Sequence, residues 1–133
     1  MNILADADFL VALAKEDDIN HERALKTIEA LGGASIFVTP FTIPEAATVL
    51  SYKVSHVAAK KFLASARNRN FVELPLNQEL VQKADDLFLS VQKKGTSWID
   101  CLNVGFTYLY RLDGILSFDK FYQRVGVKML SRP

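Results

Sequence analysis

Short apolar runs alternate with amphipathic stretches along this chain. Four of the runs have the length and composition of buried strands, and each ends at a polar residue or a proline. They cover residues 3–5, 35–39, 71–74 and 115–118, and a weaker run over 125–130 indicates a fifth strand. The spacing leaves room for one or two helices between successive strands.

Between those runs the apolar residues recur every three or four positions, which predicts helices. The helices cover residues 9–13, 20–31, 42–52, 55–68, 77–95 and 99–112. Asp8 is the expected cap of the first helix, Asn77 is the expected cap of the fifth, and Gly32 and Gly33 end the second. The residues expected on the buried stripes of the fourth and fifth helices are Val57, Ala58, Lys61, Phe62 and Ala66, and Leu80, Val81, Ala84, Leu87, Phe88 and Val91.

The order of these elements predicts a three-layer α/β sandwich. Strands separated by helices pair in parallel through right-handed crossovers, so we expect a small sheet of four to five strands between two layers of helices. The chain has 133 residues, 50% of them hydrophobic, and it has no internal repeat or linker. We therefore expect a single domain over residues 1–133.

The overall charge singles out no class of partner. Sixteen basic and fifteen acidic residues leave a formal charge of +1, so any signal for nucleic-acid binding must be local. The lone cysteine, Cys101, forms no internal disulfide and fits a small buried apolar position. A secretion signal and an apolar run of roughly 20 residues are both missing. We expect a soluble, cytoplasmic protein.

Four acidic residues lie at the edges of apolar stretches. Asp6 and Asp119 each follow a predicted strand, and Glu45 and Asp100 lie near the starts of predicted helices. The carboxyl ends of parallel strands form the edge where α/β sheets bind ligands, so we expect the four side chains to converge there. Clustered carboxylates repel one another and suit Mg²⁺ or Mn²⁺, which activates water and polarises a phosphodiester. The sequence therefore predicts a metal-dependent hydrolase.

Each acid also has an ordinary structural interpretation. Glu45 and Asp100 are favoured in the first turn of a helix, Asp119 fits a turn, and Asp8 fits a helix cap better than a metal ligand. Three nearby polar side chains are expected either to support a ligating carboxylate by hydrogen bonds or to have buried structural roles. These are Ser117, Asn103 and Ser97, and Asp8 is counted with the supporting residues of the site.

A phosphotransferase of the haloacid dehalogenase type is the enzymatic alternative. In that mechanism Asp6 is the nucleophile and Asp8 is the general acid. It also needs a later lysine and a paired acidic motif, of which Asp119-Lys120 is a poor imitation. The two histidines have no Ser, Cys or metal-ligand partner at a suitable spacing, so neither is expected to be catalytic.

With these acids in place, the chain resembles the PIN-domain nucleases, and among them the small toxins of the VapC type. The resemblance runs almost from end to end, and the order and spacing of its short motifs carry it. The motifs are Ile3-Leu4-Ala5-Asp6-Ala7-Asp8-Phe9-Leu10, then His21 with Ala24, then residues 39–47 around Glu45, 97–103 around Asp100 and 114–121 around Asp119.

The resemblance implies a small parallel sheet flanked by helices and a Mg²⁺ or Mn²⁺ site that cleaves single-stranded RNA. The implied catalytic and metal-binding acids are Asp6, Glu45, Asp100 and Asp119, with Ser117 as a supporting hydroxyl. Two residues depart from the family pattern. The family more often has Ser, Thr or Asn in place of Asp8, and Thr or Ser in place of Ala7. A non-catalytic PIN-like module that binds RNA or a partner remains the alternative.

The resemblance also implies partners. Toxins of this type are usually homodimers, and an antitoxin places its tail in an apolar groove and inserts a basic side chain toward the acids. The expected groove residues are Phe9, Leu13, Phe41 and Val49, with core packing as their alternative. RNA phosphates require cations, and the candidates are Lys60, Lys61, Arg67, Arg69, Lys93, Lys94, Lys120 and Arg124. Lys120 and Arg124 follow Asp119 closely, so they are the expected substrate-binding pair.

Overall fold

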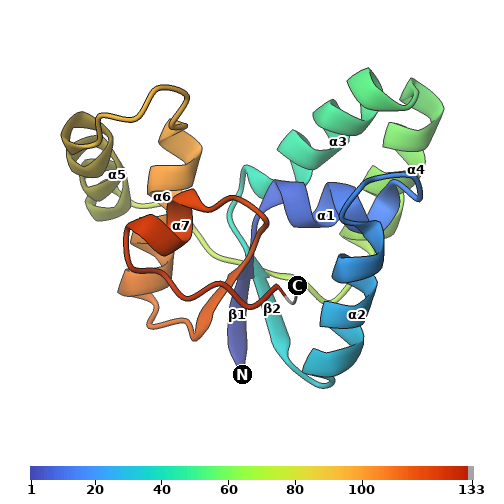
Figure 1. Cartoon of the computed structure of the whole chain (residues 1–133), viewed down its shortest axis with the longest axis horizontal. Helices are drawn as coiled ribbons and strands as arrows, with labels where there is room; N and C mark the ends of the chain where they lie inside the picture. Colours follow the sequence, from blue (N-terminus) through green and yellow to red (C-terminus); the bar gives the residue numbers. More distant parts are fainter. Residues whose placement is uncertain (132–133) are drawn as a thin grey trace.

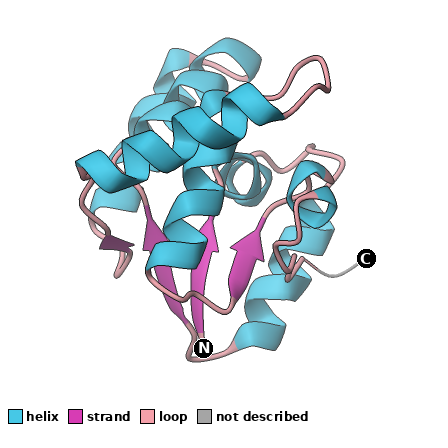
Figure 2. Ribbon diagram, turned by 90° about the vertical axis from the view of Figure 1, so that its left-hand side faces the viewer, coloured by secondary structure: helices cyan, strands magenta, loops and turns pink. Residues whose placement is uncertain are grey.

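The computed structural model describes residues 1–131 and contains a parallel sheet. Over these residues its strands are β1 (Asn2–Ala5), β2 (Ser35–Val38), β3 (Val72–Glu73) and β4 (Gly114–Leu116). They lie in the order β3-β2-β1-β4, and each neighbouring pair is parallel. The strand arrows accordingly point one way (Figure 2). The predicted parallel α/β architecture is confirmed.

Helices cover both faces of the sheet (Figure 1). One layer consists of α1 (Ala7–Ala14), α2 (His21–Leu31), α3 (Thr42–Lys53) and α4 (His56–Arg67). The other layer consists of α5 (Gln78–Ser90), α6 (Trp98–Leu109) and the short α7 (Phe121–Arg124). No helix within residues 1–131 combines the length and the apolar character needed to span a membrane.

Strand β1 is apolar on both sides because both of its sides are buried. Ile3 and Ala5 pack with the layer of α1–α4, whereas Leu4 between them packs with α5 and α6. This alternation follows from the two-residue period of a strand. Asp6 comes next, at the point where the chain leaves the sheet.

The predicted fifth strand over 125–130 is wrong. In this segment only Met129 forms a β-bridge, and its partner is Ile115. The preceding residues form α7, which the sequence pattern did not reveal, and Gly126 then turns the chain at a φ of 87°. The segment passes so close to β4 that a Cβ on Gly114 would lie 2.7 Å from the carbonyl oxygen of Lys128. The turn leaves too few extended residues for a longer ladder.

The predicted buried stripes of α4 and α5 are right only in part. In α4 Ala66 is buried as predicted, the other buried residue is Ala59, and Val57 is 63% exposed. Helix α5 ends at Ser90, before the predicted stop, and Phe88 on it is 41% exposed.

Candidate active site

The site begins where β1 and β4 end side by side. Ala5 pairs with Leu116, so the next residues, Asp6 and Ser117, leave the sheet at the same edge. The backbone N–H of Asp6 donates to the carbonyl oxygen of Leu116 at 2.9 Å and extends the pairing by one step. Both side chains are buried. The carboxyl edge of the sheet therefore holds a carboxylate beside a hydroxyl.

The Asp6 carboxylate accepts hydrogen bonds on both oxygens. Its Oδ1 accepts from the backbone N–H of Ala7 at 2.8 Å and from the side-chain amide of Asn103 at 3.2 Å. Its Oδ2 accepts from the hydroxyl of Tyr122 at 2.8 Å and from that of Ser117 at 3.2 Å. A carboxylate offers about four lone-pair positions, so these donors engage the whole group and hold its orientation.

Asp8 lies beside Asp6 and does not cap α1, so that prediction is wrong. Helix α1 already begins at Ala7 with Asp6 as its cap, which places Asp8 within the first turn. The Oδ2 of Asp8 accepts from the backbone N–H of Phe118 at 2.9 Å and from the Ser117 hydroxyl at 3.1 Å. Its buried Oδ1 has no hydrogen-bond partner in the described part of the chain. A buried carboxylate oxygen of this kind is normally stabilised by a proton, a water or a cation.

Asp100 and Glu45 reach the site from the first turns of α6 and α3. The Oδ1 of Asp100 accepts from the Tyr122 hydroxyl at 3.1 Å. Burial, followed by the negative charge of Asp6, raises the pKa of Asp100 to about 6. Burial and the charge of Asp100 likewise raise the pKa of Glu45. The three carboxylates therefore lie within electrostatic range of one another.

The remaining acids belong to the same cluster. Burial is the main cause that raises the pKa of Asp6 to about 7, and the charges of Asp8 and Glu45 add to it. Burial also raises the pKa of Asp8 to about 6, and the charge of Asp119 contributes. Asp119 adds to the raised pKa of Asp100 as well. The structure thus brings the four predicted acids together and joins Asp8 to them.

Asp119 lies at the exposed rim of this cluster. Its Oδ1 accepts from the backbone N–H of Phe121 at 2.9 Å, which is the turn contact expected of an aspartate at this position. Lys120 precedes α7 and Arg124 ends it, and both are exposed. Neither forms a salt bridge within residues 1–131, whereas Arg67 pairs with Glu73 at 3.5 Å. Lys120 and Arg124 are thus available to a phosphate.

The donor set fits a hard divalent cation in its chemistry. Carboxylate oxygens are the ligands that Mg²⁺ and Mn²⁺ prefer, and a positive charge relieves the repulsion that raises these pKa values. As the side chains stand, no three Asp, Glu, His or Cys groups of residues 1–131 converge closely enough to hold one ion. Ligation therefore requires side-chain rotation, for which the partly exposed Asp100 and Glu45 have more room than the buried Asp6.

Tyr122 is the site residue that sequence reasoning missed. It is fully buried, and its hydroxyl contacts Asp6, Asp100 and Asn103. An aromatic residue shortly after Asp119 is ordinarily a core residue, so the local pattern does not distinguish it. The one available signal is the residue type, because a buried phenol needs a hydrogen-bond partner. The supporting roles expected of Ser117 and Asn103 agree with their bonds to Asp6.

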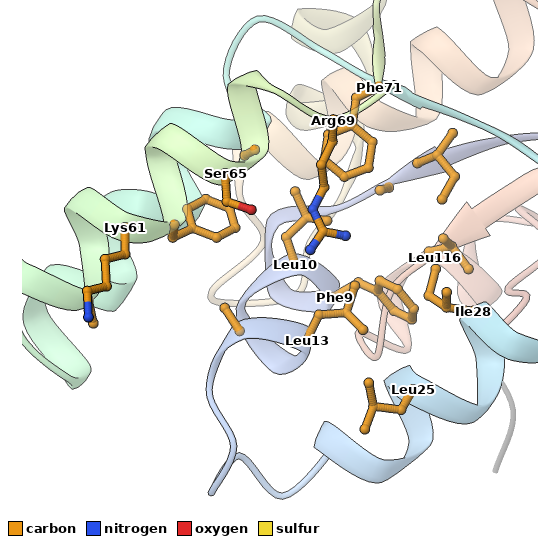
Figure 3. Close-up of a pocket in the computed structure, with 16 residues that line it drawn as sticks. Phe9, Leu10, Leu13, Leu25, Ile28, Lys61, Ser65, Arg69, Phe71 and Leu116 are labelled. Carbon is orange, nitrogen blue, oxygen red and sulfur yellow. The ribbon is translucent and has the colours of Figure 1, made fainter.

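A pocket of about 540 Å³ lies between α1, α2 and α4 (Figure 3), and none of the acids is among the residues that line it. Phe9 and Leu13 line it, as the groove prediction expects, but Phe41 and Val49 do not. Those two residues follow β2 and lie on or beside α3, which is not part of the pocket wall. Other lining residues are Leu10, Leu25, Ile28, Phe62 and Phe71, and the charged ones are Lys61 and Arg69. The pocket is an apolar groove with cationic residues.

Comparison with a family model gives a match over most of the chain. The model described as PIN domain covers residues 3–128. A search of curated proteins gave no match.

Three solved structures are similar over nearly their whole length. VapC20 of Mycobacterium tuberculosis, described as a toxin that cleaves the sarcin-ricin loop, has a TM-score of 0.84 and 18% identity, covering 95% of this chain and 96% of that one. VapBC2 of Rickettsia felis, bound to a DNA fragment from its promoter, has a TM-score of 0.72 and 10% identity, covering 97% of each chain. A toxin–antitoxin complex from Klebsiella pneumoniae has a TM-score of 0.62 and 14% identity, covering 89% of this chain and 87% of that one. Identities at this level establish similarity of fold.

Proposed function

The chain belongs to the PIN domain family, and from this premise we propose that it is a metal-dependent endoribonuclease that cleaves single-stranded RNA. The observation that carries the proposal is the acidic cluster at the carboxyl edge of the sheet. Asp6 and Asp100 share one buried hydroxyl there, and burial together with the charges of neighbouring carboxylates raises both pKa values. A fold gains no stability from such an arrangement by itself, because the charges are desolvated without a cationic partner. Function is the better explanation.

The proposed cofactor is Mg²⁺ or Mn²⁺, held by Asp6, Glu45, Asp100 and Asp119. When bound, such an ion lowers the pKa of water and polarises the phosphodiester. Asp8 is next to these acids, and its Oδ1 has no hydrogen-bond partner within residues 1–131. This also favours binding of a cation at the site.

The other residues of the site orient and bind. Asn103 and Ser117 hold the Asp6 carboxylate from opposite oxygens, which keeps this ligand in one orientation during turnover. Lys120 precedes α7 and Arg124 is its last residue, and in this proposal the two bind the RNA phosphates on either side of the scissile bond. Their positive charge offsets the repulsion between the acidic cluster and a polyanion.

The test of this proposal is cleavage of a labelled single-stranded RNA by the purified chain. We expect no cleavage in EDTA and recovery of cleavage when Mn²⁺ or Mg²⁺ is added in excess. Double-stranded RNA of the same sequence serves as the matched substrate and should be cleaved far more slowly. Cleavage at an equal rate in EDTA would rule out the metal-dependent mechanism.

The chain is proposed to be the toxin of a VapBC-type pair. Two of the similar structures are a VapBC2 assembly and a toxin–antitoxin complex, and the apolar groove is large enough to hold a peptide segment. An antitoxin whose apolar tail occupies the groove, and whose arginine pairs with the acids, would block both RNA and metal. A small DNA-binding protein encoded immediately upstream would be the first candidate for the antitoxin.

Further properties are proposed with this assignment. Residues 1–133 act as one nuclease domain, the active form is a homodimer, and the enzyme works in the cytoplasm. Light scattering of the purified chain tests the dimer directly, with a molar mass of twice 14.9 kDa as the expected result. The haloacid dehalogenase alternative is set aside because the family match is to the PIN domain. The cleavage assay tests the non-catalytic alternative, because a module that only binds RNA or a partner would not cleave RNA with added metal.

A further inference from the structure

The Tyr122 hydroxyl occupies the position between two carboxylates. Its oxygen lies 2.8 Å from Oδ2 of Asp6 and 3.1 Å from Oδ1 of Asp100, and it accepts a hydrogen bond from the side-chain amide of Asn103 at 2.9 Å. A phenol has one proton to donate. That proton serves two acceptors, so the hydroxyl holds together two groups that otherwise repel each other.

The phenol itself is fixed in place. Tyr122 is fully buried, and its ring packs edge-on against Phe121 with centroids 5.4 Å apart. Its backbone carbonyl accepts from the N–H of Val127 at 2.9 Å. Asp100, in contrast, is only partly buried and lies in the first turn of a helix. When the contact opens, the movement is therefore that of the Asp100 side chain.

We propose that Tyr122 is a positioning residue that holds Asp6 and Asp100 in a closed pair and competes with the divalent cation for them. The inference rests on the proposed function, since it assumes that a cation binds these carboxylates. Asp6 accepts hydrogen bonds from Ala7, Asn103 and Tyr122, and the single proton of the Ser117 hydroxyl is shared between Asp6 and Asp8. A cation that ligates Oδ2 of Asp6 competes with the Tyr122 hydroxyl for that oxygen. The hydroxyl is the donor shared with Asp100, so a cation that bridges both acids displaces this bond.

The competition has a defined direction. A donor that lies between two carboxylates neutralises part of their charge, and its removal leaves them with more to gain from a cation. Phenylalanine keeps the ring and its packing and removes only the hydroxyl. We expect Tyr122→Phe to bind Mn²⁺ on the order of tenfold more tightly, which corresponds to the loss of one charge-assisted hydrogen bond from the ion-free state.

Isothermal titration of the full chain with Mn²⁺ at pH 7.5, without RNA, tests the proposal. The matched control is Tyr110→Phe, which removes a phenol hydroxyl that bonds the carbonyl oxygen of Pro75 at 3.4 Å. This variant should bind Mn²⁺ as the wild type does. Melting curves give a second readout: Tyr122→Phe should be less stable than wild type in EDTA, and saturating Mn²⁺ should narrow the difference.

An unchanged or weaker Mn²⁺ affinity in folded Tyr122→Phe would overturn the proposal, because the hydroxyl would then have a structural or ion-supporting role. If the wild type itself does not bind Mn²⁺, the proposed metal site is wrong. This result can be distinguished from failure of the Tyr122 inference, in which the wild type binds Mn²⁺ and the variant binds it no more tightly. If Tyr122→Phe does not fold, NMR of wild-type chain labelled at tyrosine Cζ replaces it, with Mg²⁺ as the titrant. The chain has four tyrosines, so Tyr52→Phe, Tyr108→Phe and Tyr110→Phe assign Tyr122 by elimination. A Tyr122 signal that does not move on Mg²⁺ saturation would contradict the proposal.

Discussion

Helix α1 separates two regions of opposite character. Asp6 and Asp8, at its start, belong to the acidic site, whereas Phe9 and Leu13 on the same helix line the apolar groove. In the acidic site nearly every carboxylate oxygen named above has a hydrogen-bond donor, yet the negative charges have no cation. In the groove the side chains have apolar neighbours, yet a volume of about 540 Å³ is not filled by the chain.

The difference shows how each region can be completed. Hydrogen bonds fix the orientation of a carboxylate but do not cancel its charge, so the acidic site still favours a cation. Apolar walls gain free energy when water is displaced, so the groove favours an apolar segment of a partner. Because one short helix contributes to both, a ligand in the groove would lie close to Asp6 and Asp8. Substitutions that affect one region and spare the other test this division.

Loss of a site acid should have the largest effect. Asp6→Asn and Asp100→Asn each remove a carboxylate at the centre of the cluster, and we expect RNA cleavage in Mn²⁺ to fall roughly 100-fold or more. Asn at position 6 still accepts from Ala7 through its oxygen and can donate to the hydroxyls that now donate to Asp6. Single-turnover cleavage of single-stranded RNA measures the loss.

The matched control is Asp86→Asn on the surface of α5, where the carboxylate accepts a hydrogen bond from Gln82 and from no other group of residues 1–131. It should cleave at the wild-type rate. At pH 8 and without metal, the melting temperature of Asp6→Asn should equal or exceed that of wild type, because a desolvated charge is removed. Wild-type rates for both site variants would show that these acids have no catalytic role.

A charge placed in the groove should act on the partner alone. Leu25 lines the groove and is 44% exposed, so Leu25→Glu leaves the core intact. Burial of the new carboxylate under an antitoxin tail should weaken that complex by about 2 kcal/mol, roughly 30-fold. Leu63→Glu is the control, since Leu63 is 39% exposed on α4 and does not line the groove.

Binding of the proposed antitoxin to each variant measures the effect, with RNA cleavage as the check on folding. Both variants should cleave RNA as the wild type does. Equal affinity of the partner for Leu25→Glu and Leu63→Glu would place the antitoxin contact elsewhere on the chain.

The two regions also differ in how far the sequence could predict them. The acids follow strands or begin helices, so strand order and helix starts were enough to bring Asp6, Glu45, Asp100 and Asp119 to one edge. The groove depends on how three helices pack, which explains why the groove prediction is wrong for both Phe41 and Val49. Local patterns report the period of an element and where it ends, but not which side chains face a gap between elements.

The same limit explains two errors near the site. Asp8 was expected to cap α1, but the helix begins earlier because Asp6 takes the cap position. The choice between two nearby aspartates depends on the donors at the end of β4, namely Ser117 and the backbone of Phe118. Tyr122 was missed because its partners lie far away in the sequence. Contacts across the fold decide such roles, and no local pattern encodes them.

The acidic site should make stability depend on pH. Asp6 and Asp100 have folded pKa values of about 7 and about 6, above the ordinary value of 3.8. Between about pH 4 and pH 7 the folded chain therefore binds more protons than the unfolded chain, and stability is lost as the pH rises through this window. We expect the ion-free protein to be on the order of 3–4 kcal/mol less stable at pH 8 than at pH 5 through these two groups.

Urea unfolding in EDTA at both pH values measures this difference. Asp6→Asn should show a smaller difference than wild type, because the most strongly shifted group is gone. If the wild type has a lower free energy of unfolding at pH 5 than at pH 8, and Asp6→Asn shows the same difference, the raised pKa values are contradicted.

The smallest effect is expected at the rim. Lys120→Ala and Arg124→Ala remove exposed cations that make no salt bridge within residues 1–131. Each should raise the KM for RNA about threefold and reduce its salt dependence, with little change in kcat. Lys94→Ala, in the exposed segment after α5, is the control. An equal effect of all three substitutions would indicate nonspecific attraction rather than a substrate path beside Asp119.

The central claim is that distant acids converge into one site that binds a divalent cation. Anomalous diffraction from crystals of the chain soaked in Mn²⁺ tests it most directly. We expect a manganese peak within bonding distance of the carboxylates of Asp6 and Asp100. Manganese found only on the outer surface, with this site empty at saturating concentration, would contradict it.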